Sequence, residues 1–134
     1  PVKQHRTKTT NRYFNYIYVR MGAHTLIHKR TEDDIWKNLF ELPLVETEKD
    51  LSEEEFLACP QFHALFAEGE VRMVRTLLRG AKHVLSHRVI YTNFYEVTLP
   101  DNSSSFSSYQ RVAVEDLGRY AVPRLIHAFL EKYV

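Results

Sequence analysis

The stretch LSHRVIYTNFYEVTL, residues 85–99, decides the fold that we expect for this chain. Apolar and aromatic residues recur there at every second position, which is typical of a β-strand with one face against a core. His87 falls on that apolar side, and the polar pair Ser86 and His87 stands at the start of the stretch. The pattern therefore predicts a long core strand. Its inward-facing residues are Leu85, Val89, Tyr91, Tyr95, Val97 and Leu99.

Two earlier segments also have the composition of strands. YFNYIYVR (13–20) and HTLIHKR (24–30) are rich in aromatic and β-branched residues, and Met21-Gly22 between them is a turn signal. We expect these two strands to pair with each other as a hairpin.

Four further segments are shorter or less regular. Residues 34–46 predict an irregular segment that enters a short strand, and QRVAV at 110–114 predicts a last short strand. The segment VRMVRTLL, residues 71–78, fits a helix or a strand equally well. The Ser-rich stretch PDNSSSFSSY, residues 100–109, predicts a loop with Phe106 as an anchor.

Two segments carry helix signals. In residues 50–68, Ser52 and Glu55 have the spacing of a capping box, and Pro60 starts a second helical turn or helix. Near the C-terminus, Pro123 suits the first turn of a helix with one apolar stripe. The residues of that stripe are Leu125, Ile126, Phe129, Leu130 and Tyr133.

The composition suits one folded domain. The chain has 134 residues, of which 44% are hydrophobic, so it can bury a core of its own. The strands and helices together predict an α+β domain with an antiparallel or mixed sheet covered by helices. We expect a basic N-terminal tail over residues 1–10 and the domain over residues 11–134. Because the sequence begins at Pro1 without a Met, we also expect a fragment of a longer protein.

Cysteine content and hydropathy indicate the compartment. The single cysteine, Cys59, cannot form an internal disulfide or a cluster of thiolate ligands, which fits a reducing, cytoplasmic setting. No apolar run approaches the roughly 18 residues of a membrane span, so we expect no membrane partner.

The charges are segregated along the chain although the net charge is only +1. Residues 1–30 hold seven Lys or Arg and no acid, residues 31–70 hold twelve acids and two lysines, and residues 71–95 hold five Lys or Arg and no acid. If the two basic segments share a face, that face attracts phosphates; otherwise these are separate solvated faces.

Neither the glutamates nor the histidines have the spacing of a metal site. Glu53, Glu54 and Glu55 are consecutive, so on a helix they point about 100° apart and do not converge. His24 and His28 share one side of a strand, but no third ligand is evident. We therefore expect no metal ligands in this chain. A lone cysteine in an apolar helix is usually a core residue, so Cys59 is not expected to be a nucleophile and we expect no catalytic residues.

Three segments taken in order resemble a known family. They are KRTEDDIWKNLFELPLVE (29–46), HVLSHRVIYTNFYEV (83–97) and GRYAVPRLIHAFLEKY (118–133). Together they resemble the C-terminal domain of the bacterial A/G-specific adenine DNA glycosylases, the MutY family, over nearly the whole chain. The most specific part is a W-x-x-L-aromatic-E-x-P segment followed later by an S-H pair that opens a strand. In this chain the first of these is Trp36, Leu39, Phe40, Glu41 and Pro43.

The chain departs from the family pattern at three places. Asn38 stands where the family usually has Gly, and Leu85 stands where it often has Phe before Ser86-His87. The R-E-x-x-E-E run of an active Nudix box is missing after Glu41, which argues against pyrophosphohydrolase activity.

The resemblance implies a Nudix-like fold and a role in base-excision repair. It implies that the domain recognises 8-oxoguanine opposite a mispaired adenine in double-stranded DNA. A catalytic N-terminal domain with an iron–sulfur cluster, which is absent from this fragment, would remove the adenine. The fragment itself would hold no cofactor and would act in the bacterial cytoplasm, at the nucleoid.

Ser86 is the residue whose chemistry suits the oxidised base. Guanine presents two acceptors, N7 and O6, on its major-groove edge, whereas oxidation at C8 makes N7 a donor and adds the acceptor O8. A serine hydroxyl both donates and accepts, so Ser86 can meet both groups. We expect Leu85, Ser86 and His87 to form the lesion-binding loop.

Basic residues near that loop are candidates for phosphate contacts that carry no sequence information. These are Arg79, Lys82 and Arg88. Two alternatives stay open: a Nudix-type nucleotide pyrophosphohydrolase, and a protein-interaction module. DNA binding that weakens steeply with rising salt would distinguish the DNA-binding interpretations from the protein-interaction module.

Overall fold

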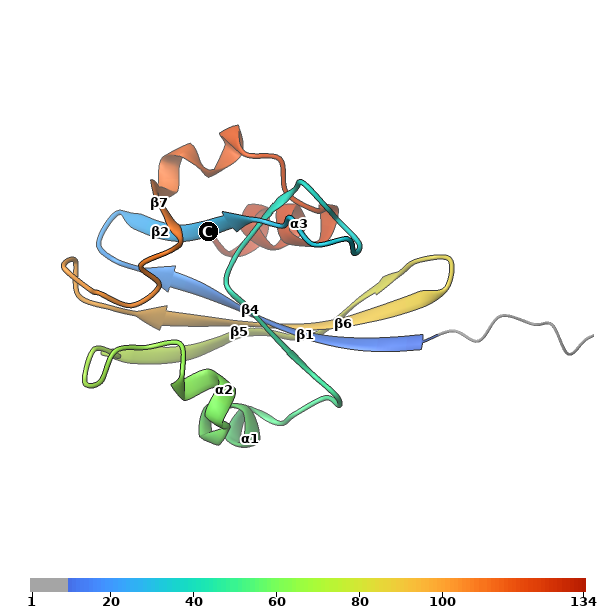
Figure 1. Cartoon of the computed structure of the whole chain (residues 1–134), viewed down its shortest axis with the longest axis horizontal. Helices are drawn as coiled ribbons and strands as arrows, with labels where there is room; N and C mark the ends of the chain where they lie inside the picture. The colour runs from blue at the N-terminus through green and yellow to red at the C-terminus, as the bar shows by residue number, and fades with distance from the viewer. Residues whose placement is uncertain (1–9) are drawn as a thin grey trace, which may run out of the picture.

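The computed structural model describes residues 10–134 of the chain (Figure 1). The predicted N-terminal tail lies outside these residues, except that Thr10 is the first residue of β1. In chain order the elements are β1 (Thr10–Arg20), β2 (His24–Lys29), β3 (Phe40–Glu41), β4 (Leu44–Thr47), α1 (Glu53–Ala58), α2 (Pro60–His63), β5 (Met73–Val84), β6 (Arg88–Thr98), β7 (Gln110–Ala113), the 3-10 helix η2 (Val114–Arg119) and α3 (Arg124–Tyr133).

The strands form two sheets in separate layers. Four strands make the main sheet, in the order β4-β1-β6-β5, and three make a smaller sheet, in the order β3-β2-β7. Helices α1 and α2 cover one face of the main sheet, and the smaller sheet and α3 cover the other (Figure 1). β1 is parallel to β6 and antiparallel to β4, so the main sheet is mixed. The predicted α+β class, with a mixed sheet flanked by helices in one domain, is confirmed.

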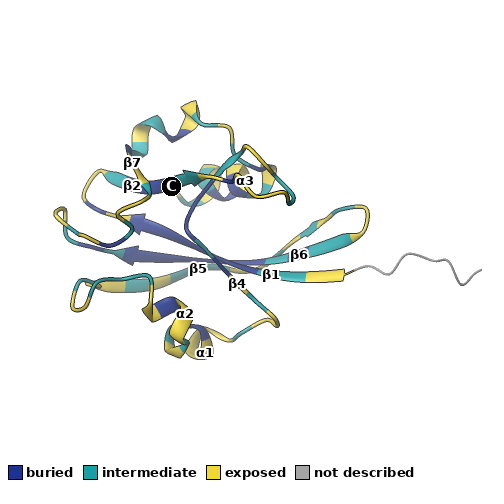
Figure 2. Ribbon diagram, in the orientation of Figure 1, coloured by how far each residue is buried: buried dark blue, intermediate teal, exposed yellow. Residues whose placement is uncertain are grey.

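The central strands β1 and β6 are buried on both faces for much of their length (Figure 2). On the α3 side, Phe94 stacks between Tyr16 and Phe129, with ring centroids 5.6 Å and 4.0 Å away. On the α1 side, Tyr95 stacks on Phe56 at 4.6 Å. A parallel pair in the middle of a sheet needs cover on both faces, and these rings supply it.

The predicted strand over residues 85–99 is partly wrong. β6 begins at Arg88, and β5 runs as far as Val84, which pairs with Val89. Leu85, Ser86 and His87 therefore form the turn of a long β5–β6 hairpin. The alternation favoured an earlier start because Leu85 and His87 continue its period, but the chain reverses direction there. The ambiguous segment 71–78 lies mostly in β5 and is a strand from Met73 onward.

The predicted hairpin between β1 and β2 is also wrong. Both strands exist, but only the bridge between Met21 and His24 joins them at the turn. Both edges of β1 are taken by β4 and β6, so β2 crosses to the other layer and pairs with β3 and β7. The composition of a strand indicates that it will pair, but it does not choose the partner.

The helix signals in the sequence are confirmed. The Ser52 hydroxyl accepts from the Glu55 N–H at 3.1 Å, and the Glu55 carboxylate accepts from the Ser52 N–H at 2.9 Å, which is a capping box at the start of α1. Pro60 begins α2, and Pro123 directly precedes α3. Among residues 10–134, no helix has the length and apolar character needed to cross a membrane.

The loop between β2 and β3 turns sharply at two residues in the left-handed region. Trp36 has φ of 59° and Asn38 has φ of 72°. The Asn38 N–H donates to the Arg30 carbonyl at 2.7 Å, and the Arg30 N–H donates to the Leu39 carbonyl at 2.9 Å, which closes the loop. Asparagine tolerates this conformation better than other residues with a side chain, so Asn38 can stand where glycine would be usual.

The left-handed backbone at Asn38 gives a prediction about stability. Replacing Asn38 with Ala should lower the free energy of unfolding by about 1 kcal/mol, because Ala adopts positive φ less readily, whereas Asn38→Gly should leave it unchanged or raise it. Urea unfolding of both variants measures this. Asn102→Ala, at an exposed asparagine outside the positive-φ region, is the control and should change little. Equal stability of the Ala and Gly variants would contradict the prediction.

Candidate nucleic-acid interface at the β5–β6 hairpin

The turn between β5 and β6 holds the predicted lesion-binding residues at an end of the main sheet. The Leu85 N–H donates to the Arg88 carbonyl at 2.8 Å, which closes the turn with backbone groups alone. Ser86 and His87 are exposed at its tip, whereas Leu85 is half-buried and packs against the core. The hydroxyl of Ser86 therefore lies at the surface, on a turn whose base is fixed.

The first residue of β1 holds the other side of this turn. The Thr10 N–H donates to the His87 carbonyl at 3.0 Å, and the Thr10 hydroxyl donates to the same carbonyl at 3.3 Å. These bonds extend the parallel β1–β6 ladder by one step beyond Arg88. Nothing in the local sequence pointed to Thr10, because the contact spans 77 positions.

Trp36 supports the hairpin from the α3 side of the main sheet. Its ring meets the ring of His83 on β5 edge-on at 6.0 Å and that of Phe14 on β1 at 5.9 Å. Trp36 is half-buried and packs against the core, as expected for a core aromatic. The left-handed turn at Asn38 thus places the ring of Trp36 beneath the β5–β6 hairpin.

An ion-pair network centred on Asp34 ties this loop to the sheet. Arg12 makes two hydrogen bonds to Asp34, at 2.8 and 2.9 Å, and two to Glu46, both at 2.8 Å. Arg30 reaches Asp34 at 2.9 Å, and Arg88 reaches it at 3.1 Å. The Arg12 guanidinium holds the pKa of Asp34 well below its usual range, and the carboxylates of Glu46 and Asp34 raise the pKa of Arg12.

A second carboxylate of this region is almost completely buried. Glu41 is 2% exposed and accepts from Arg30 at 3.0 and 3.1 Å and from the Tyr16 hydroxyl at 2.7 Å. The Nε2 atom of His28 lies 2.9 Å from the Oε2 atom of Glu41. A buried carboxylate is tolerated only with such partners, so Glu41 of the W-x-x-L-aromatic-E segment has a structural role in the core.

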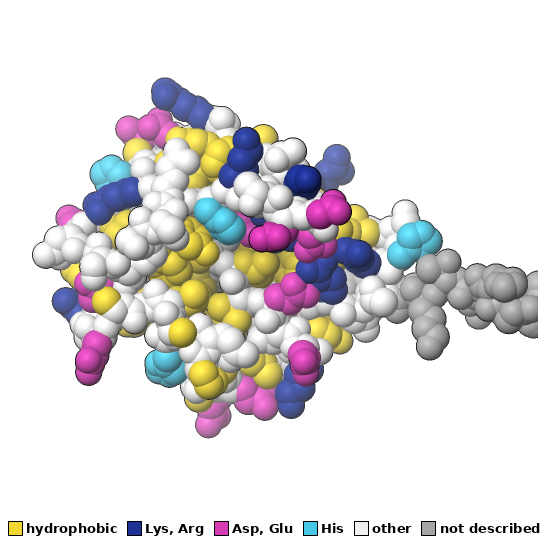
Figure 3. Space-filling model, in the orientation of Figure 1, with side chains coloured by type: hydrophobic (Ala, Val, Ile, Leu, Met, Phe, Trp, Pro, Cys, Tyr) yellow, Lys and Arg dark blue, Asp and Glu magenta, His cyan; other side chains and the backbone are white. Residues whose placement is uncertain are grey.

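Within residues 10–134, the two basic segments do not form one free basic face. Most of their arginines reach carboxylates, and on the face drawn in Figure 3 acidic and basic side chains are interspersed. Basic and acidic residues that are separated along the chain therefore lie next to each other in the structure, because the strands place basic residues beside the acids of the middle segment.

The three residues predicted to contact phosphates differ in their surroundings. Lys82 is exposed on β5. Arg88 is paired with Asp34 but has a side chain that is 41% exposed. Arg79 is exposed, but its guanidinium is already engaged, because it donates to the Tyr95 hydroxyl at 2.7 Å and to the Leu51 carbonyl at 2.9 Å. Only Lys82 and Arg88 of the three lie within four residues of Ser86.

The donor groups do not assemble into a cation site. Within residues 10–134, no group of three or more His, Cys, Asp or Glu lies close enough together to hold a metal ion. His28 is taken up by Glu41, and Glu55 by its capping box. The described residues therefore offer no preformed set of three or more such donors for a divalent cation.

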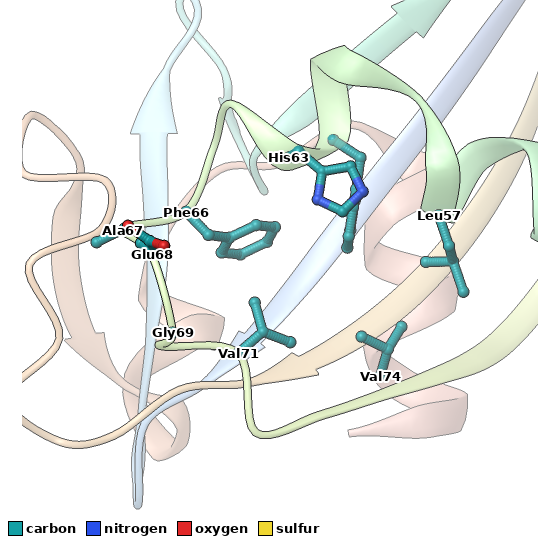
Figure 4. Close-up of a pocket in the computed structure, with 9 residues that line it drawn as sticks. Leu57, His63, Phe66, Ala67, Glu68, Gly69, Val71 and Val74 are labelled. Atoms are coloured by element: carbon teal, nitrogen blue, oxygen red, sulfur yellow. The ribbon is translucent and has the colours of Figure 1, made fainter.

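The groove between α2 and β5 is mainly apolar (Figure 4). It has a volume of about 570 Å³ and is lined by apolar side chains that include Leu57, Phe66 and Val74, with His63 above them. Glu68 is its single carboxylate and lies at one end. Such a lining suits packing against apolar atoms and offers no cluster of charges for a pyrophosphate.

Asp34 is the residue of this region that sequence reasoning missed. It stands in the acidic run Glu32-Asp33-Asp34, where the sequence gives no reason to prefer one of the three. Only the geometry shows that Asp34 receives three arginines while Asp33 is exposed.

Comparison with known proteins identifies the family. The profile of the NUDIX domain matches residues 15–132, so the chain belongs to the NUDIX domain family. No curated protein sequence matches the chain.

Solved structures share the fold at low sequence identity. The C-terminal domain of mouse MUTYH, determined in complex with human PCNA, has a TM-score of 0.68 and 15% identity over 91% of this chain and 86% of its own. The MutT protein from Methanosarcina mazei has a TM-score of 0.59 and 16% identity over 95% of both chains. The ORF135 protein of E. coli has a TM-score of 0.60 and 15% identity over 93% of this chain and 89% of its own. These structures confirm the predicted Nudix-like fold, and they include both the MUTYH C-terminal domain and a MutT protein.

The Asp34 network predicts a dependence of stability on pH. Folding lowers the pKa of Asp34 from its ordinary value of 3.8. The ionised carboxylate therefore makes its full contribution to the free energy of unfolding above pH 3.8, and this contribution is lost as the pH falls through the lower folded-state pKa. Asp34→Asn should therefore cost about 2 kcal/mol near pH 7, and this difference from the unaltered chain should shrink below about pH 4.

Chemical denaturation of both proteins from neutral to acidic pH measures this difference. Asp33→Asn is the matched control at the exposed neighbouring acid and should show a small difference at every pH. A cost of Asp34→Asn that is the same in acid as at neutral pH would show that the charge of Asp34 is not the cause.

Proposed function

We propose that this chain is the domain of an A/G-specific adenine DNA glycosylase that recognises 8-oxoguanine opposite a mispaired adenine. The observation that carries the proposal is Ser86, an exposed hydroxyl at the tip of the β5–β6 hairpin. Both sides of its turn are fixed by backbone hydrogen bonds, from Leu85 and from Thr10. A group on such a support can meet a base edge without a large loss of conformational entropy.

The recognition step follows from the hydrogen-bonding groups of the two bases. The Ser86 oxygen accepts from N7–H of 8-oxoguanine, a donor that guanine lacks, and its O–H is then free to donate to O8. His87 lies beside it for a phosphate or sugar contact. Leu85 takes the place of an aromatic residue, and its half-buried side chain holds the loop from below.

The comparisons give the fold that both candidate functions share: the MUTYH C-terminal domain matches at a TM-score of 0.68 and the archaeal MutT protein at 0.59. The observation that favours the lesion-recognition domain over a hydrolase is the lack of a group of three or more metal-donor residues in residues 10–134. In this proposal a catalytic domain with an iron–sulfur cluster, on the same polypeptide, removes the adenine in the bacterial cytoplasm.

Basic residues near the loop supply contacts that do not depend on the base sequence. We assign phosphate contacts to Lys82, Arg88 and Arg79, with unequal weight. Lys82 has an exposed side chain, Arg88 shares Asp34 with two other arginines, and Arg79 would have to leave Tyr95 and Leu51 to reach DNA. Substitution of Arg79 should therefore weaken DNA binding least.

Ser86→Ala in the glycosylase that contains this domain tests the proposal. The preference for removing adenine opposite 8-oxoguanine rather than opposite guanine should fall by roughly 5- to 150-fold, the equivalent of about 1–3 kcal/mol for a paired base contact. Single-turnover rates on the two duplexes measure it.

Two further variants sharpen this experiment. Ser108→Ala removes an exposed serine from the Ser-rich loop after β6, at the opposite end of that strand from the hairpin, and should leave the preference unchanged. Ser86→Thr keeps the hydroxyl and should restore most of it. A preference that survives in Ser86→Ala would show that Ser86 does not read the lesion.

Because the chain belongs to the NUDIX family, the second candidate function is that of a nucleotide pyrophosphohydrolase. We expect this chain, incubated with Mg²⁺ and a panel of nucleoside triphosphates that includes the 8-oxo form of dGTP, to release no pyrophosphate or phosphate. The reason is the absence of clustered carboxylates from residues 10–134. Turnover that depends on Mg²⁺ and survives Ser86→Ala would favour the hydrolase.

A further inference from the structure

A second feature of the hairpin end lies on the face of the main sheet that α1 and α2 cover elsewhere. The strand register places Tyr13, Tyr91 and Lys82 side by side across β1, β6 and β5. The next row toward the hairpin tip consists of Asn11, Val89 and Val84. Paired residues of neighbouring strands point to the same face, so these side chains form one surface. We call it the tyrosine platform: Asn11, Tyr13, Lys82, Val84, Val89 and Tyr91.

No described helix covers this platform. On the same face, α1 and α2 pack over the distal half of β1 and β6, where Ile17 and Tyr95 belong to a core cluster. Tyr13, Val89 and Tyr91 belong to neither core cluster of residues 10–134 and remain partly exposed, and Val84 is 65% exposed. Figure 2 shows the change along both strands, from buried to intermediate and exposed toward the hairpin.

A polar boundary separates the platform from the covered half of the sheet. The Asn93 amide donates to Asn15 and to Asp50, each at 3.2 Å, and its oxygen accepts from the Gly80 N–H at 2.8 Å. This row lies between Tyr91 and Tyr95 on β6. Because these polar groups bond to one another, the apolar surface on the hairpin side is a separate patch, and a patch of this kind marks a contact surface.

The chemistry of the platform suits a nucleic-acid backbone. Its six residues include one cation, Lys82, and no acid, and the nearby Asp50 is already engaged by Asn93 and lies 3.6 Å from Arg79. Tyrosine, asparagine and lysine are among the side chains that proteins use to contact phosphates and sugars. The two tyrosine rings stack on each other at 5.6 Å with an angle of 15° between their planes, so they form one apolar unit beside Lys82.

The position and size of the platform match a short piece of DNA strand. Val84 is two residues from Ser86, so the platform is continuous with the loop assigned to the lesion. From β1 to β5 it spans two strand spacings of about 4.8 Å, or roughly 10 Å, which equals the rise of about three nucleotides at about 3.4 Å each.

We propose that the tyrosine platform binds the sugar–phosphate backbone of the nucleotides that adjoin the oxidised guanine. The proposal rests on the lesion-recognition function assigned to the Ser86 loop. Tyr13 and Tyr91 pack against deoxyribose, and Lys82 pairs with a phosphate. These contacts carry no base information, so they strengthen binding to damaged and undamaged DNA alike and hold the strand while Ser86 reads the base.

Nuclear magnetic resonance of the 134-residue chain tests the platform directly. Backbone amide shifts are followed while a duplex with an 8-oxoguanine:adenine pair is added, and then one with guanine:adenine. We expect the amides of Tyr13, Val89 and Tyr91 to shift with both duplexes, and the Ser86 amide to shift more with the damaged one.

Binding measurements on variants give a second, independent test. The double variant Tyr13→Thr, Tyr91→Thr keeps residues that favour strands and should weaken binding to both duplexes roughly tenfold. Tyr120→Thr, at a half-buried tyrosine next to Phe40 in the other layer, is its control and should not weaken binding. Lys82→Ala should lower the slope of log affinity against log salt by about 1, and Lys132→Ala on α3 should not.

The outcomes separate this inference from the function on which it rests. Shifts at the Ser86 loop without shifts at Tyr13 and Tyr91 would overturn the platform and leave the lesion role intact. Shifts at the platform without any at Ser86 would support backbone binding and overturn the lesion role. If neither region responds to DNA, both fail. If the platform amides shift with protein concentration alone, a second copy of the chain is the occupant and the DNA assignment is wrong.

Discussion

The parallel pairing of β1 with β6 is the contact on which the rest of the structure depends. The ladder runs over eleven residues of each strand and occupies the centre of the main sheet. Each core cluster is built on one of its faces. The same ladder begins at Thr10 and Arg88, so it also fixes the base of the turn that holds Ser86.

Ion pairs stabilise the hairpin end of the main sheet, whereas apolar packing stabilises its centre. Asp34 joins arginines from β1, from the end of β2 and from β6, and the loop that contains Asp34 also carries Trp36. Because these three arginines pair with Asp34, they are less available to a partner. Affinity for a polyanion would then come from particular positions, among them Lys82, rather than from a general positive field.

Local signals in the sequence were sufficient for many of the elements and insufficient for their partners. The capping box at Ser52 and Glu55 and the helix after Pro123 follow from short-range rules, and the structure confirms them. The partner of β1 could not be read in the same way, because its pairing with β6 spans most of the chain. The exposure of Ser86 fits the predicted site, but the Tyr13–Tyr91 pair was invisible because it exists only once the strands are in register.

The long sequence separation inside the central ladder has a consequence for folding. Thr10 and His87 are 77 positions apart, so β1 can pair with β4 early but cannot pair with β6 until most of the chain is available. At a synthesis rate of about 5–20 residues per second, the aromatic strand β1 would wait roughly 4–15 seconds for β6 on the ribosome. Topologies dominated by such distant pairings fold slowly in general. The central ladder therefore closes only after β6 has been synthesised.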